Sequence, residues 1–118
     1  MGFREHVALE IEPQGDGTSV VAVEAGEQHL NPSGSVHGGV LATMIDVAMG
    51  TAVAATGGQS PVTVSLAVTY LEPGRAGRLE AQARVRKRGK RLMVVEAEVV
   101  QDGDVLADAL GTFSVKPG

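Results

Sequence analysis

The first part of the chain alternates between apolar and polar positions. From His6 to Pro13 every second residue is apolar, and this period of two is typical of a half-buried strand. A Gln-Gly-Asp-Gly turn follows, and the β-branched segment 18–25 predicts the returning strand of a hairpin. Residues 26–38 are rich in Asn, Pro, Ser and Gly, so we expect a loop there.

From Gly39 to about Ala55 the alternation is lost, and apolar residues recur at helical spacing. This pattern predicts one long helix, which Thr56-Gly57-Gly58 ends. The rest of the chain predicts four strands, over Val62–Glu72, Arg78–Arg88, Leu92–Gln101 and Val105–Val115. This order predicts an α+β domain spanning 1–118, with an antiparallel sheet of five to six strands and a single helix on one face. Because one helix leaves the other face uncovered, we expect exposed apolar surface there and an oligomer that covers it.

Composition excludes several classes of function. The chain has 118 residues, 43% of them hydrophobic, a net charge of −4 and no cysteine. It therefore has no disulfide, thiolate metal site or cysteine nucleophile, and its charge and three aromatic residues argue against nucleic acid. The longest apolar run, Val40–Ala55, is too short for a bilayer and contains Asp46. The charged N-terminal segment lacks the apolar stretch of a secretory signal, so we expect a cytoplasmic protein without membrane contact.

Candidate chemistry lies at the predicted helix. Gly38 and Gly39 stand where it begins, so their backbone N–H groups are unpaired and open to a phosphate or a developing oxyanion. Alternatively, the two glycines only let the loop bend into the helix. Asp46 interrupts the apolar helix, where an ionised carboxylate is costly unless it is paired or catalytic. The alternative is a position on a solvated strip of the helix.

The spacing of these groups suggests a shared site. Gly38 and Asp46 are eight residues apart, which is about 12 Å along a helix at 1.5 Å per residue. One carbonyl group cannot contact both within one chain. A two-fold dimer with antiparallel helices would place the glycine end of one helix opposite the aspartate of the other.

The run Asn31-x-x-Gly34-x-x-His37-Gly38-Gly39, followed by Asp46, VTVSLAVTYLEP, RKRGKRL and ALGTF, carries a resemblance that covers nearly the whole chain. It resembles the hotdog-fold thioesterases of the phenylacetate-pathway and 4-hydroxybenzoyl-CoA type. The resemblance implies a sheet wrapped around one long central helix, homodimers whose sheets join edge to edge, and usually homotetramers. It also implies hydrolysis of an acyl-CoA thioester, with coenzyme A as part of the substrate. The reaction requires no cofactor and no metal, and the three histidines lack the spacing of a zinc site.

By position, the resemblance implies a catalytic role for five residues. Gly38 resembles the oxyanion donor and Asp46 the catalytic carboxylate, acting either as nucleophile or as general base. Asn31 and His37 resemble the residues that orient the thioester or the water and support the loop. Thr63 matches a hydroxyl residue that holds the attacking water. His37 can instead anchor the loop through backbone carbonyls, and Thr63 can be an ordinary strand residue that faces the helix.

Two sets of residues are expected to bind substrate. Small aliphatic residues of the helix and the strand after it would line a pocket for an aryl or medium-chain acyl group. Six of the ten basic residues lie between Arg84 and Arg91 and would contact the phosphates of coenzyme A, or alternatively form a solvated turn that discourages aggregation. The binding residues expected are Gly39, Val40, Thr43, Met44, Val47, Arg88, Lys90 and Arg91.

Two other functions stay open at this point. A hydratase or dehydratase acting on acyl thioesters needs a loop histidine and a helix carboxylate, and His29 and Asp46 fit those types. A non-catalytic acyl-CoA sensor on the same scaffold would bind the ligand without turnover.

Overall fold

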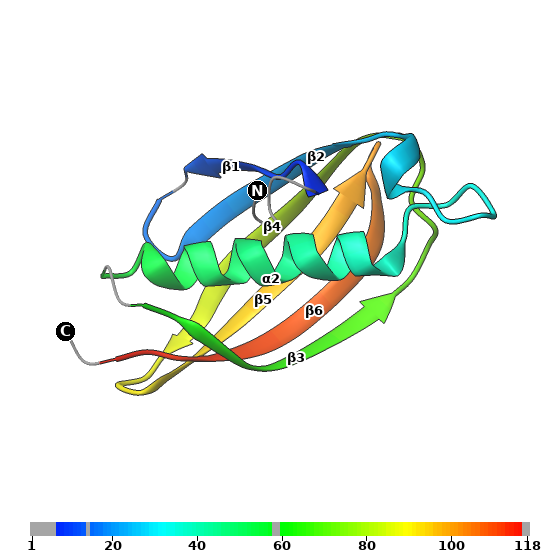
Figure 1. Ribbon diagram of the computed structural model, residues 1–118. Coiled ribbons are helices and arrows are strands. Elements are labelled where there is room, and N and C mark those ends of the chain that lie inside the picture. Colours follow the sequence, from blue (N-terminus) through cyan, green and yellow to red (C-terminus); the bar gives the residue numbers. More distant parts are fainter. Residues whose placement is uncertain (1–6, 14, 58–59, 117–118) are drawn as a thin grey trace.

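The computed structural model describes residues 7–13, 15–57 and 60–116. In these residues one long helix lies across a curved antiparallel sheet of six strands (Figure 1). The elements are β1 (Glu10–Pro13), β2 (Thr18–Ala25), the short 3-10 helix η1 (Glu27–His29), α2 (Gly38–Ala54), β3 (Val62–Tyr70), β4 (Gly77–Arg88), β5 (Leu92–Gln101) and β6 (Asp104–Ser114). The strand order is β1-β2-β4-β5-β6-β3, so β3 forms one edge of the sheet.

Local sequence explains most of these boundaries. The hairpin between β5 and β6 turns at Asp102 and Gly103, whose φ angles of 49° and 85° are those that Asp-Gly adopts in a tight turn. α2 begins at Gly38 and ends at Ala54, so its first and its last residue each lie one position earlier than predicted. The fold class, with one helix on an antiparallel sheet, is therefore confirmed.

The first strand is shorter than predicted. The alternating pattern predicts a strand from His6, but β1 begins only at Glu10, and His6 lies outside the described residues. Ala8 has a φ of 64°, which interrupts extended backbone. Val7 is buried apart from the strand, so the apolar alternation does not reflect one continuous element.

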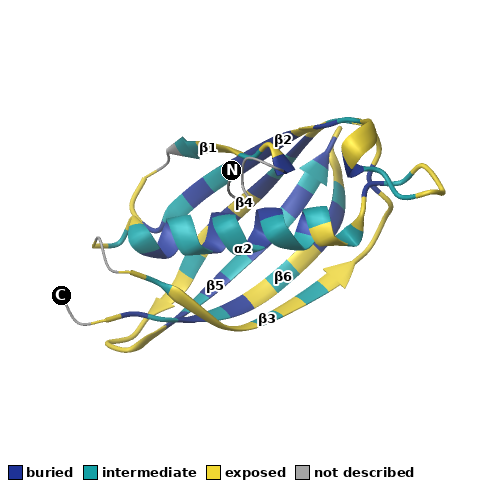
Figure 2. Cartoon of the chain, viewed as in Figure 1, coloured by how far each residue is buried: buried dark blue, intermediate teal, exposed yellow. Residues whose placement is uncertain are grey.

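The core lies between α2 and the helix-facing side of the sheet. Alternate residues of β2, β4 and β5 are buried against the helix, as Figure 2 shows in dark blue. Methionines and small aliphatic residues of α2 fill the interface, together with Phe113 from β6. Ser19 of β2 also donates a buried hydrogen bond of 2.6 Å to the carbonyl of Ala48, which fixes the helix on the sheet.

The opposite, outer face of the sheet is mainly charged, and Leu110 is 47% exposed there, so the expected apolar surface is present only in part. Arg78 forms ion pairs with Glu12 and Glu80. The hydrogen bonds in these pairs raise the pKa of Arg78, and the bond to Glu12 has the larger effect. Arg84 forms an ion pair with Glu96 on the neighbouring strand. Charged outward positions let one face of an antiparallel sheet contact water.

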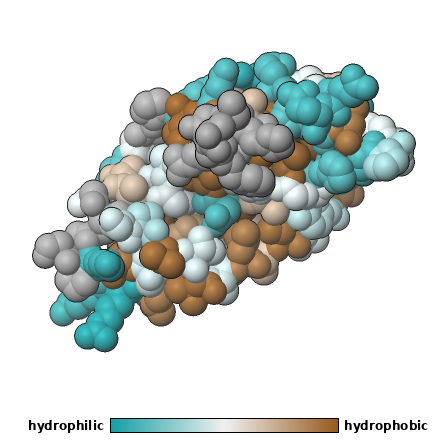
Figure 3. All heavy atoms as spheres, in the orientation of Figure 1, coloured by the Kyte–Doolittle hydropathy of each residue, from teal (hydrophilic) through white to brown (hydrophobic). Residues whose placement is uncertain are grey.

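Exposed apolar side chains gather instead at the edge strand β3. Figure 3 shows brown surface along the lower edge of the view, where β3 lies in Figure 1. Four of the large exposed apolar residues belong to β3 or follow it directly: Val62, Val64, Tyr70 and Leu71. A long apolar edge strand is a surface that proteins usually pair or cover. Within the described residues, no helix is both long enough and apolar enough to cross a bilayer.

Candidate functional site

The loop before α2 is fixed by His29. This side chain is 2% exposed. Its Nδ1 accepts a hydrogen bond of 2.9 Å from the N–H of Gly26, which assigns the proton to Nε2, and Nε2 donates to the carbonyl of Val7 at 2.7 Å. Both ring nitrogens are therefore occupied by backbone groups. This geometry argues against the hydratase alternative, which needs His29 as an acid or base.

Asn31 stabilises the same loop. Its Oδ1 accepts hydrogen bonds from the N–H and hydroxyl of Ser33, at 3.0 and 2.7 Å, and from the N–H of Ser35, at 3.1 Å. Side-chain oxygens of asparagine commonly close turns in this way. The other terminal atom, the Nδ2 amide, has no partner among the described residues. Asn31 thus supports the loop and keeps a donor for a second contact.

His37 and the two glycines form the start of α2. The N–H of His37 donates to the carbonyl of His29, and the carbonyl of His37 accepts from Val40, both at 2.9 Å. The His37 side chain is exposed and makes no hydrogen bond in the described part of the chain, so its backbone, not its ring, anchors the loop. The amides of Gly38 and Gly39 have no acceptor in that same part. These are two unpaired donors at the positive end of a helix.

Gly38 and Gly39 do not form a bend that only glycine could adopt. Neither has a positive φ, so the backbone there is open to other residues. A Cβ atom added at Gly38 would lie 3.3 Å from the ring of Tyr70, whereas one added at Gly39 would meet nothing within 4 Å. Gly38 is therefore restricted by a close neighbour, and Gly39 faces open space.

Asp46 lies on the side of α2 that faces β3, and Thr63 binds it. The Thr63 hydroxyl donates a hydrogen bond of 2.6 Å to Asp46 Oδ1, a length typical of a bond to a carboxylate. Two residues that sequence reasoning selected separately are thus brought together. Thr63 faces the helix as an ordinary strand residue would, and it also holds the carboxylate.

A β-bulge in β3 directs Thr63 to the helix. Thr63 lies opposite Phe113, but Ser65 lies opposite Thr112, so one extra residue, Val64, is inserted. Counting alternately back from the half-buried Leu66 would place Val64 toward the helix and Thr63 toward the outer face. The bulge reverses this, and the Val64 side chain is 59% exposed. No turn residue marks the bulge in the sequence, so sequence reasoning missed it.

In one chain Gly38, with its unpaired amide, and the Asp46 carboxylate line different cavities. A cavity of about 510 Å³ contains Asp46 and Thr63 among mainly apolar neighbours. A second cavity of about 400 Å³, at the start of α2, contains Asn31, Gly38 and Tyr70. The axial separation expected from the helix rise is retained, because both glycines and Asp46 belong to the single helix α2.

The predicted acyl-pocket residues lie in different surroundings in the structure. Val47 lines the cavity of Asp46. Met44 is 0% exposed, packs in the core and lines neither cavity in the single chain, so its place in an acyl pocket stays a prediction. Val40 packs partly buried against the same core. The hydroxyl of Thr43 bonds to the carbonyl of Gly39 at 2.8 Å, one turn earlier on the helix.

The basic cluster is partly neutralised. Arg88 pairs with Asp16 at 2.9 Å, and Glu96 pairs with both Arg84 and Arg86. Lys90 and Arg91 lie exposed in the turn between β4 and β5 and have no ion pair in the described residues. They are the basic side chains of the predicted set that stay open to an anion. Nowhere in the described ranges do three or more His, Cys, Asp or Glu side chains lie close enough to hold a metal.

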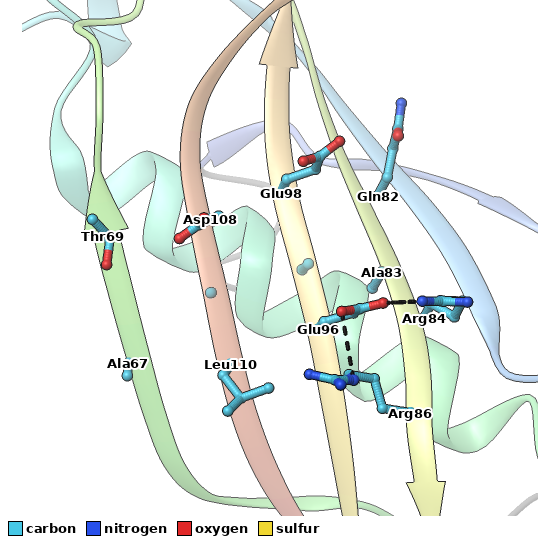
Figure 4. Close-up of a pocket in the computed structure, with 12 residues that line it drawn as sticks. Ala67, Thr69, Gln82, Ala83, Arg84, Arg86, Glu96, Glu98, Asp108 and Leu110 are labelled. Atoms are coloured by element: carbon cyan, nitrogen blue, oxygen red, sulfur yellow. Dashed lines mark hydrogen bonds and ion pairs between the residues drawn. The ribbon is translucent and has the colours of Figure 1, made fainter.

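The cavity on the outer face of the sheet, about 660 Å³ in volume, was not anticipated. Figure 4 shows Arg84 and Arg86 reaching toward Glu96, with Glu98 and Asp108 on the neighbouring strands. Its lining mixes both signs of charge. The predicted catalytic residues are absent from this lining.

A single long helix on a curved antiparallel sheet with the strand order seen here defines the hotdog fold. The model of the thioesterase superfamily matches residues 33–107, and the chain belongs to that family.

Two solved structures and one relative found by sequence agree with this assignment. A conserved protein from Pseudomonas aeruginosa is 33% identical, with a TM-score of 0.94 over 98% of this chain and 94% of that one. The Escherichia coli PaaI protein from the phenylacetic acid degradation operon is 31% identical, with a TM-score of 0.90 over 98% of this chain and 84% of that one. Human acyl-coenzyme A thioesterase 13 is 31% identical over 85 residues, which are 70% of this chain and 61% of the human protein.

Proposed function

We propose that the protein hydrolyses an aryl or medium-chain acyl-CoA thioester to the free acid and coenzyme A. The observation that carries the proposal is the hydrogen bond of 2.6 Å between Thr63 and Asp46 Oδ1. It leaves Oδ2 of the carboxylate for chemistry in a cavity where, among the described lining residues, no other side chain is charged. The names of two similar proteins, an acyl-coenzyme A thioesterase and a phenylacetic acid degradation protein, support the same substrate class.

The amide of Gly38 is the proposed oxyanion donor. An unpaired N–H at a helix start can stabilise the negative charge that forms on the thioester oxygen. In the general-base route, Asp46 takes a proton from water as the water oxygen bonds to the carbonyl carbon. The C–S bond then breaks, and the proton passes to the thiolate of coenzyme A. In the nucleophilic route, Asp46 attacks the carbonyl carbon and displaces the thiolate of coenzyme A as the C–S bond breaks. Water then hydrolyses the mixed anhydride to the free acid and the Asp46 carboxylate, and the proton released passes to the thiolate. Both routes require an ionised carboxylate.

The proposed site is shared between two chains. In one chain Gly38 and Asp46 line different cavities, so a substrate that contacts both needs a second helix. The edge strand β3 offers a long apolar border for antiparallel pairing with another copy, which would extend the sheet and place the two α2 helices side by side. We further propose that two such homodimers form a homotetramer. Light scattering coupled to gel filtration tests both, and a monomer would overturn the shared site.

Asp46→Asn tests the function directly. The chain has no cysteine, so a thiol-reactive dye reports only released coenzyme A. We expect the wild type to release thiol from at least one of phenylacetyl-, benzoyl-, hexanoyl- and palmitoyl-CoA. Asp46→Asn should lower kcat by about 10²-fold or more, because the amide neither accepts a proton nor attacks carbon.

Asp108→Asn is the matched control, since it makes the same chemical change on the outer face of the sheet. It should leave the rate unchanged. If the wild type binds the esters without releasing thiol, the protein is an acyl-CoA sensor and the thioesterase proposal fails.

A further inference from the structure

Tyr70 closes over the start of α2 from the end of β3. Its hydroxyl donates a hydrogen bond of 3.1 Å to the carbonyl of Gly38. The ring lies against the same residue, because a Cβ built there would be 3.3 to 3.5 Å from three atoms of the tyrosine. The side chain is nevertheless 53% exposed and borders the cavity that contains Asn31. Tyr70 therefore contacts the backbone of the proposed donor without belonging to the core.

The end of β3 that carries Tyr70 is held firmly by β6. Tyr70 lies opposite Ala107, which is fully buried, so its side chain projects from the helix-facing side of the sheet. The amides of the next two residues, Leu71 and Glu72, both donate to the carbonyl of Leu106, at 2.7 and 3.1 Å. The strand end is thus bound to β6, and the ring is held from a fixed point.

A helix that begins with two glycines needs a contact like that of Tyr70 to hold its first peptide units. Glycine has no Cβ and its backbone populates a wide range of φ and ψ, so two in succession give the poorly fixed donors that catalysis tolerates least. The carbonyl of Gly38 and the N–H of Gly39 belong to one peptide unit. A hydrogen bond to that carbonyl fixes the plane of the unit and polarises its N–H. The ring also restricts Gly38 itself, whose own N–H is the proposed oxyanion donor.

We propose that Tyr70 is a positioning residue of the thioester site, one that holds the Gly38–Gly39 backbone and so aims its N–H groups. The expected effect on catalysis rests on the proposed function, whereas the hold of Tyr70 on the Gly38–Gly39 backbone does not. Tyr70 takes no part in the proton transfers. Its hydroxyl fixes the Gly38 carbonyl, and its ring prevents the first turn of α2 from moving toward β3.

Tyr70→Phe and Tyr70→Leu separate the two contacts. Tyr70→Phe keeps the ring and removes the hydrogen bond, so kcat should fall about 3- to 10-fold with KM within about twofold. Tyr70→Leu removes both contacts and should lower kcat further. Leu110→Ala, a truncation of another half-exposed apolar residue on the outer face, is the control and should keep the wild-type rate. Equal kcat for wild type and both Tyr70 variants would overturn the inference.

Amide NMR keeps this test independent of activity. In a ¹H–¹⁵N correlation spectrum, Tyr70→Phe should move the Gly39 amide signal more than those of residues distant from α2. Dimer size and the melting curve should stay as in the wild type. Unchanged Gly38 and Gly39 signals would contradict the inference even if the wild type had no thioesterase activity. Shifted signals together with an inactive wild type would instead refute only the proposed function.

Discussion

Carboxylates on the two sides of the sheet lie in opposite surroundings. On the helix-facing side, Asp46 has one neutral donor, Thr63, and otherwise uncharged neighbours in its cavity. On the outer face, Glu96 lies between two guanidinium groups, and Glu98 faces Asp108 across neighbouring strands. The outer cavity is the larger, at about 660 against 510 Å³. Size alone would therefore point to the outer face and away from the proposed site.

The difference teaches where a carboxylate can react. A carboxylate paired with arginine is stabilised in its charged form, and its oxygens are occupied. One that accepts a single hydroxyl bond keeps an oxygen for a proton or for carbon. We therefore expect substitutions on the helix-facing side to change the rate, and substitutions on the outer face to change only stability.

Removing the proposed oxyanion donor should have the largest effect. Gly38 is the first residue of α2, where proline is tolerated, and His37 before it has φ −53° and ψ 135°, which suits a residue preceding proline. Gly38→Pro deletes the N–H but also places a Cβ 3.3 Å from the Tyr70 ring, so it is compared with Gly38→Ala, which adds the same Cβ and keeps the N–H. Relative to Gly38→Ala, Gly38→Pro should lower kcat about 10²- to 10³-fold. Steady-state thiol release measures the effect, and circular dichroism checks that the helix forms.

Mixing variants tests whether the site is shared. Gly38→Pro and Asp46→Asn chains should each retain about 1% of the activity or less, but a hybrid dimer would contain one site with both groups intact. After subunit exchange in equal amounts, half of the dimers are hybrids with one working site of two, so about a quarter of the wild-type activity should return. No recovery, although native mass spectrometry detects hybrids, would show that each site uses one chain only.

How far the sequence predicts this arrangement depends on the range of the forces involved. Asp102-Gly103 and the long apolar period of α2 act locally, so the hairpin and the helix follow from the sequence. Asp46 was also identifiable, because a charge within an apolar helix is unusual whatever surrounds it. These features need no knowledge of distant neighbours.

The features that were missed depend on contacts between distant segments. The bulge at Val64 is fixed by register with β6, which places Thr63 opposite Phe113. The pairing of Arg88 with Asp16 joins two hairpins that are remote in sequence. A pattern of single residues contains neither, so the bulge that turns Thr63 to the helix and the neutralised cluster emerged only from the fold.

The hydrogen bond from Thr63 should matter less than the donor of Gly38 but remain measurable. Thr63→Val keeps the branched shape and removes the hydroxyl, and a hydrogen bond to a charged group contributes about 1.5 to 3 kcal/mol. We expect kcat to fall roughly tenfold or more, with Thr63→Ser restoring most of it. Full activity of Thr63→Val in the thiol-release assay would reduce Thr63 to an ordinary strand residue.

The smallest effect belongs to the outer face. Glu98 and Asp108 are direct cross-strand partners, and like charges in that position destabilise a sheet. Asp108→Asn should therefore raise the free energy of unfolding by a few tenths of a kcal/mol to about 1 kcal/mol, as measured by urea denaturation at low salt. The gain should shrink at high ionic strength, because salt screens the repulsion between exposed carboxylates. Asp104→Asn, whose cross-strand partner is the neutral Gln101, is the control and should change little. An equal gain from both variants would assign the effect to net charge, and any change in kcat for Asp108→Asn would break the separation between the two faces.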